Sequence, residues 1–150
     1  MALSISFNIS LMKRLIYLLS FVPFFVVAAD VHIDILGIKA GKGQIVVSVW
    51  DSEDSYLKTA FIIKTNAASN IRNNQLRFTF SGSLPEECAI SVYYDENANG
   101  KLDTNWLGIP REAVGISNNV KGRFGPPKYN DGMITLSGNE QIFKIYLEEI

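Results

Sequence analysis

The segment that indicates the fold most clearly is Cys88-Ala-Ile-Ser-Val-Tyr-Tyr94. Every second residue from Cys88 onward is apolar or aromatic, and this period of two is typical of a half-buried β-strand. Gly82 and Pro85 precede the segment and predict a turn before it. We therefore expect a strand that is entered through a tight connection.

Short segments of the same kind recur on both sides of this strand. They lie at residues 31–36, 45–50, 60–64, 76–80, 133–136 and 142–147. Glycines in residues 40–43 predict a turn that joins 31–36 and 45–50 in a hairpin. By the same reasoning, residues 133–136 are expected to pair with 142–147.

Residues 30–150 show no sustained helical period, and only residues 51–58 suggest a single helical turn. Six or seven short strands in a chain of this length favour an antiparallel β-sandwich, because parallel folds need crossover helices. The predicted fold class is therefore all-β, with one sandwich domain at residues 30–150.

Residues 1–29 have the order of a secretory signal peptide. A positive patch at Lys13 and Arg14 precedes an apolar run at residues 15–27, and small residues end at Ala29. The run is shorter than the roughly 20 residues of a membrane-spanning helix, so we expect cleavage rather than an uncleaved anchor. The start is Met1 or Met12, and the product is periplasmic or secreted, with no membrane span after cleavage.

Composition narrows the functional classes. Removal of Lys13 and Arg14 with the signal leaves a formal charge of −3, which gives no basic excess for nucleic acid to attract. Cys88 is the single cysteine, so no disulfide forms within the chain, and we expect it to be buried. With His32 as the single histidine and no Gly-x-Ser-x-Gly, no nucleophile and base are visible, and we expect no enzyme.

The segment from Asp95 to Gly132 is expected to be one long ordered loop. Its 38 residues hold six glycines, three prolines and six asparagines without a strand pattern. It also carries large apolar residues, which a disordered segment would lack. Trp106, Arg111, Phe124 and Tyr129 are its candidate partner-binding residues. The alternative is that the aromatic rings anchor the loop and the charges are merely solvated.

The start of this loop has the ligand order of a calcium loop. Asp95, Asn97, Asn99 and Asp103 occupy positions 1, 3, 5 and 9, and Gly100 permits the bend at position 6. The Lys101 carbonyl adds a ligand at position 7. Position 12 is Trp106 rather than glutamate, so further ligands would be water, Glu112 or Asp131. The alternative is a polar turn at Asn99-Gly100 that binds no metal.

Three stretches carry a family resemblance. They are Tyr94 to Glu112, Gly115-Ile-Ser-Asn-Asn119 and Phe124-Gly-Pro-Pro127. Together they resemble the bacterial exported family known as domain of unknown function 2141. The resemblance implies a small periplasmic or secreted β-sandwich, similar to transthyretin-like (prealbumin-like) or carboxypeptidase-regulatory-like modules. Tyr94 stands where the family often has histidine, and Ile116 where it often has phenylalanine. The resemblance implies no activity.

Three functions remain open from the sequence. The first is a non-catalytic module that binds an envelope protein or polysaccharide through the calcium-ordered loop. The second is a purely structural envelope protein in which calcium only holds the fold. The third is a metal-dependent hydrolase that uses Asp95, Asp103 or Glu112.

Overall fold

The computed structural model describes residues 30–82, 84–123 and 125–150. The predicted signal peptide, residues 1–29, lies outside the described residues, and so does Phe124.

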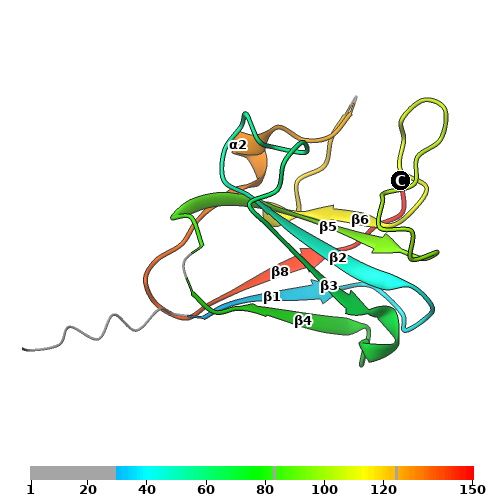
Figure 1. Cartoon of the computed structure of the whole chain (residues 1–150), viewed down its shortest axis with the longest axis horizontal. Helices are drawn as coiled ribbons and strands as arrows, with labels where there is room; N and C mark the ends of the chain where they lie inside the picture. Colours follow the sequence, from blue (N-terminus) through cyan, green and yellow to red (C-terminus); the bar gives the residue numbers. More distant parts are fainter. Residues whose placement is uncertain (1–29, 83, 124) are drawn as a thin grey trace, which may run out of the picture.

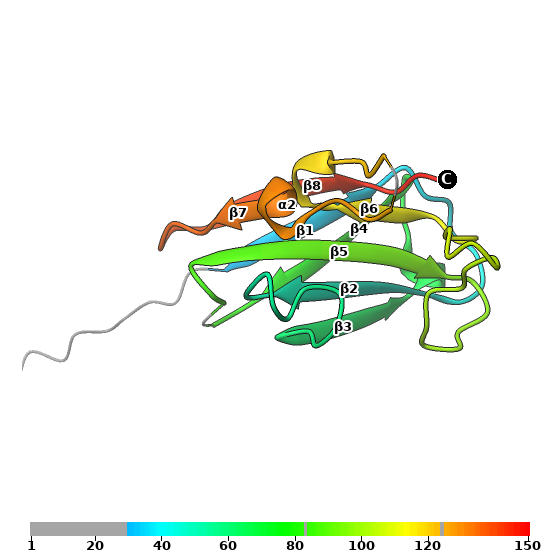
Figure 2. The same ribbon diagram turned by 90° about the horizontal axis from the view of Figure 1, so that it is seen from above.

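Within the described chain, strands form two sheets that pack face to face (Figures 1 and 2). One sheet holds β4 (Gln75–Phe80), β1 (Val31–Leu36) and β8 (Gln141–Tyr146), in that order. The other holds β3 (Ile62–Ala67), β2 (Gln44–Trp50), β5 (Glu87–Asp95) and β6 (Val114–Ile116), with β7 (Met133–Thr135) also paired to β5. The predicted all-β, mainly antiparallel sandwich is confirmed.

The core lies between the sheets because alternate side chains of the long strands point inward. Its fully buried members come from both sheets and include Ile33, Ile35, Val47 and Ile90. Cys88 is buried among them as predicted, and burial raises the pKa of its thiol to about 11. Within the described residues, the strands and the buried core side chains lie between Val31 and Leu147.

Both predicted hairpins are wrong. The strand β1 pairs with β4 and, in parallel, with β8, whereas β2 pairs with β3 and β5 in the opposite sheet. The strand β7 pairs with β5 rather than with β8. In each case the short connection crosses from one sheet to the other. Because consecutive strands lie in opposite sheets, their apolar faces bury each other across the sandwich. The period of two shows which face of a strand is buried, but not which strand it pairs with.

The region expected to be one long loop contains regular structure. It includes β6, a 3-10 turn η2 (Ser117–Asn119) and a short helix α2 (Tyr129–Gly132). A further 3-10 turn, η1 (Ala68–Asn70), follows β3. These elements of three or four residues are too short to produce a recognisable period. Among the described residues, no helix is long and apolar enough to cross a membrane.

Candidate metal-binding loop

The candidate loop, residues 96–113, joins the end of β5 to β6 at one end of the sandwich (Figure 1). Asp95 is the last residue of β5 and pairs with Gln44, the first residue of β2. The edge of the five-stranded sheet therefore fixes the place where the loop begins.

The carboxylate of Asp95 is fully buried and holds the loop's first turn. Its Oδ1 accepts the N–H of Asn99 at 3.0 Å, and its Oδ2 accepts the N–H of Gly100 and the side-chain amide of Gln44, each at 2.8 Å. Burial raises the pKa of Asp95, but the hydrogen bonds from Gln44, Gly100 and Asn99 outweigh it and hold the pKa below the ordinary value.

The next three candidate ligands converge on one another. The side-chain amides of Asn97 and Asn99 donate to the two carboxylate oxygens of Asp103, at 2.7 and 3.0 Å. The Oδ1 of Asn97 also accepts the Asn99 N–H, and that of Asn99 accepts the Lys101 N–H. Gly100 takes the positive φ of 77° that this bend requires.

Glu112 closes the base of the loop from its other end. The side chain is 6% exposed, and its oxygens accept the N–H groups of Glu96 at 3.1 Å and Asp103 at 2.9 Å. Two buried carboxylates, Asp95 and Glu112, thus fix the backbone on both sides of the Asn97–Asp103 turn.

The structure brings most of the predicted metal ligands together. Asp95, Asn97, Asn99 and Asp103 form one connected cluster, and Glu112 contacts its backbone. Asp131 is not brought to this cluster. It lies in α2 just before β7, and β7 pairs with the first residues of β5, at the opposite end of that strand. Between Glu112 and Asp131 the chain turns back along β5 through β6, which pairs with β5 in an antiparallel arrangement.

The oxygen atoms of the cluster suit a hard cation, although the Asp103 carboxylate already accepts two hydrogen bonds. Calcium prefers carboxylate, amide and carbonyl oxygens, and the cluster offers all three. A cation would have to compete with the amide N–H groups that Asp103 now accepts. No group of three or more His, Cys, Asp and Glu side chains is placed to hold a metal in the described ranges, so asparagine and backbone oxygens would have to contribute.

Beyond the cluster, residues 103–111 form a hydrogen-bonded hairpin tip. The N–H of Arg111 donates to the Asp103 carbonyl at 2.9 Å. The Asn105 side-chain oxygen accepts the N–H groups of Leu107 and Ile109, at 2.9 and 3.0 Å. This frame turns Trp106 outward, where its side chain is 88% exposed.

The predicted partner-binding residues do not share one surface. Trp106 and Arg111 are exposed on the tip, as expected. Tyr129 is instead 6% exposed, and its ring packs edge-on against Tyr56, which in turn packs against Trp50. Tyr129 therefore belongs to a second, aromatic core cluster, where its apolar ring is more favourably buried than exposed.

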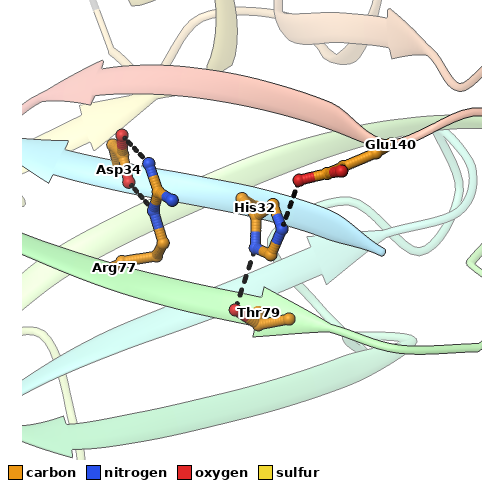
Figure 3. A network of polar contacts seen from close by, with 5 residues as sticks. All are labelled: His32, Asp34, Arg77, Thr79 and Glu140. Atoms are coloured by element: carbon orange, nitrogen blue, oxygen red, sulfur yellow. Dashed lines mark hydrogen bonds and ion pairs between the residues drawn. The ribbon is translucent and has the colours of Figure 1, made fainter. Parts of the chain in front are cut away.

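A polar network covers part of the outer face of the three-stranded sheet (Figure 3). Arg77 donates from Nε and Nη2 to both oxygens of the buried Asp34, at 2.6 and 2.8 Å. The hydrogen bonds from Arg77 hold the pKa of Asp34 below its usual value, although burial opposes them. His32 contacts Thr79 and, at 3.2 Å, the carboxylate of Glu140. The single histidine thus lies on the other sheet from the candidate loop.

The sequence reasoning missed the function of Ser117, Asn118 and Asn119, which join separate elements. The Ser117 hydroxyl accepts the Ile90 N–H at 2.9 Å and donates to the Gly132 carbonyl. Asn118 donates to the carbonyls of Asp131 and Met133. Asn119 donates to the Lys144 carbonyl and accepts the Tyr146 N–H, filling the outer edge of β8. Two adjacent asparagines, a residue type that tolerates positive φ, could have indicated a tight turn here, and both Asn118 and Asn119 have positive φ.

Ser117→Ala is expected to lower the free energy of unfolding by about 2–4 kcal/mol, because a buried N–H and a buried carbonyl lose their partner. Urea unfolding of the 30–150 domain measures the change. Ser137→Ala, at an exposed serine, is the matched control and should change stability by less than about 0.5 kcal/mol. Equal stability of the two variants would contradict the assignment of Ser117 as a structural link.

Comparison with known proteins identifies a bacterial family. A family model described as an uncharacterized protein conserved in bacteria (DUF2141) matches residues 33–144. No curated protein and no solved structure matches. The matched range runs from β1 into β8 and includes the whole candidate loop.

Proposed function

The chain belongs to the DUF2141 family of bacterial proteins, and from this premise we propose that it is an exported, non-catalytic binding module. In this proposal calcium bound by Asp95 and the loop of residues 96–113 orders that loop, and the tip of the same loop contacts a partner in the cell envelope.

The observation that carries the proposal is that Asp103 contacts both the ligand cluster, through its side chain, and the loop tip, through its backbone. Its side chain accepts the amides of Asn97 and Asn99 within the ligand cluster, while its backbone carbonyl pairs with Arg111 at the base of the tip. An ion bound by the cluster would therefore restrain the tip directly. This continuity supports a link between metal binding and partner binding.

Export is supported by the position of the fold within the chain. The first strand begins at Val31, two residues after the predicted cleavage at Ala29. Cleavage there would release the described sandwich into the periplasm or medium, where calcium is abundant.

The high exposure of Trp106 favours a binding module over a purely structural protein, because structural packing gives no reason to leave so large a ring in water. A hydrolase at the same loop is less favoured. The carboxylates of Asp95 and Glu112 are buried and accept hydrogen bonds from the loop backbone, so they are not open to a substrate.

Calcium is expected to raise the melting temperature of the 30–150 domain relative to excess chelator. Binding linkage gives about 2.7 kcal/mol at a concentration of about 100 Kd, or roughly 10 °C for a domain of this size. Thermal unfolding followed by circular dichroism, at increasing calcium concentrations, measures the effect.

Two variants make this test specific. Asp103→Ala should abolish the calcium-dependent shift, whereas Asp131→Ala, which removes a surface carboxylate at the opposite end of β5, should retain it. Magnesium should act more weakly, because it requires a smaller and stricter octahedral site. The proposal fails if calcium leaves the unfolding curve unchanged, or if Asp103→Ala shifts as much as the unchanged domain.

A further inference from the structure

The loop tip exposes an apolar cluster that the sandwich does not need. Its side chains are 88% exposed at Trp106, 61% at Leu107, 40% at Ile109 and 36% at Leu102. All four lie within eight residues on one projecting loop (Figure 1). Contiguous exposed apolar surface of this kind marks an interaction site more often than isolated exposed residues do.

The tip is held in one shape before it meets a partner. Besides the two N–H groups that the Asn105 side chain accepts, the Asn105 N–H donates to the Ile109 carbonyl at 2.8 Å and the Gly108 N–H to the Asn105 carbonyl at 2.9 Å. Thr104 and Pro110 form a bridge beneath them. Because little backbone entropy remains to be lost, apolar contacts at this tip contribute fully to binding.

The chemistry around Trp106 distinguishes between classes of partner. A sugar platform needs polar groups beside the ring to hydrogen-bond the hydroxyls, whereas the large exposed side chains on either side of Trp106 in the loop, Leu102, Leu107 and Ile109, are apolar. Thr104, Lys101 and Arg111 are the exposed polar residues of the tip. A tryptophan accompanied by aliphatic side chains matches the boundary between lipid headgroups and acyl chains, where its ring is buried and its N–H stays hydrated.

With calcium bound, the exposed cations near the loop tip suit an anionic surface. Lys101 and Arg111 flank the apolar cluster, and both are exposed and form no ion pair within the described residues. Lys42 is exposed at the same end, where its carbonyl accepts the Tyr94 hydroxyl. The carboxylates of Asp95, Asp103 and Glu112 accept hydrogen bonds but keep their negative charge, and Glu96 is exposed beside them. The calcium of the proposed function would have to offset these charges, so binding to an anionic surface requires it.

We propose that the partner of this loop is an anionic phospholipid bilayer. Trp106 and Leu107 enter the interface between headgroups and acyl chains, and Lys101 and Arg111 contact the lipid phosphates. This inference names the partner of the proposed function and rests on it, and it describes peripheral attachment rather than a membrane span.

Co-sedimentation of the 30–150 domain with vesicles tests the proposal. In millimolar calcium, the domain should pellet with vesicles of phosphatidylglycerol and phosphatidylethanolamine (3:7) but not with pure phosphatidylcholine. Tryptophan emission should shift to shorter wavelength on the anionic vesicles, since Trp106 leaves water while Trp50 is already buried.

Paired variants locate the contact. W106A/L107A should reduce the partition coefficient about tenfold or more, because two large side chains no longer enter the bilayer. F61A/I63A removes two apolar side chains of similar exposure, 50% and 58%, next to and within β3, and should bind as the unchanged domain does. K101E/R111E should abolish binding to anionic vesicles, whereas K128E, at an exposed lysine just before α2, should not.

The lipid proposal is overturned if the calcium-loaded domain fails to pellet, or if W106A/L107A binds as well as F61A/I63A. Capture of an envelope protein or polysaccharide through the tip, without vesicle binding, would also overturn it while leaving a binding module in place. The calcium melting experiment contains no lipid, so failure of the proposed function and failure of the lipid partner give different results.

Discussion

Asp95→Ala is expected to destabilise the domain by about 3–4 kcal/mol. The fully buried carboxylate accepts three hydrogen bonds, from the N–H groups of Asn99 and Gly100 and the side chain of Gln44. Alanine would leave the Gly100 N–H and the Gln44 amide without this acceptor, while the Asn99 N–H keeps its bond to the Asn97 Oδ1. Each unsatisfied buried group costs about 1–3 kcal/mol, reduced where water can enter the exposed loop. Urea unfolding in excess chelator measures this loss of free energy of unfolding without any contribution from bound metal.

Asp103→Ala is the matched control for this variant. Its carboxylate is only half-buried and accepts two exposed side-chain amides, which can turn to water when it is removed. We expect a loss of about 1 kcal/mol or less. Similar losses for the two variants would contradict the view that Asp95 is the group on which the loop's folding depends.

The contribution of Asp95 should also depend on pH. Its pKa is lower in the folded domain than the ordinary aspartate value, because the hydrogen bonds it accepts outweigh its burial. A lowered pKa gives stability that is complete above about pH 4 and is lost as the pH falls through the folded-state value. The stability difference between the unchanged domain and Asp95→Asn should therefore shrink on acidification. A difference that stays constant to pH 2 would argue against it.

The strands could be found from the sequence because their periodicity is local. Alternation along Leu76, Phe78 and Phe80 reflects one buried face, and these residues are 2–6% exposed in the structure. The partner of each strand could not be found in this way. The parallel pairing of β1 with β8 joins residues more than a hundred positions apart, and no pattern within either strand specifies the other.

The candidate site was predictable to the extent that its residues are close in sequence. The alternation of Asp95, Asn97 and Asn99 around Gly100 is enough to place them on one turn, and the structure has them together. Glu112 and Asp131 looked equivalent as distant ligands. Only the path of the chain through β6 separates them, because it leaves Glu112 beside the loop and carries Asp131 to the far end of β5.

Gly43→Ala is expected to cost about 2–5 kcal/mol, although this residue lies outside the loop. Gly43 has φ +82°, which costs an L-residue about 1–2 kcal/mol. A Cβ there would also overlap the carbonyl oxygen of Asp95 and lie 2.7 Å from that of Glu96. Both atoms belong to backbone, which cannot swing away as a side chain can, and such overpacking adds about 1–3 kcal/mol.

Gly100→Ala separates the two causes. Gly100 has nearly the same φ, +77°, but a Cβ there meets nothing within 4 Å. In excess chelator it should lose only the conformational term of about 1–2 kcal/mol. The additional loss in Gly43→Ala then measures the close approach between the β1–β2 connection and the start of the loop. If unfolding shows equal losses for the two variants, this contact does not position Asp95, and the loop is held by its own hydrogen bonds alone.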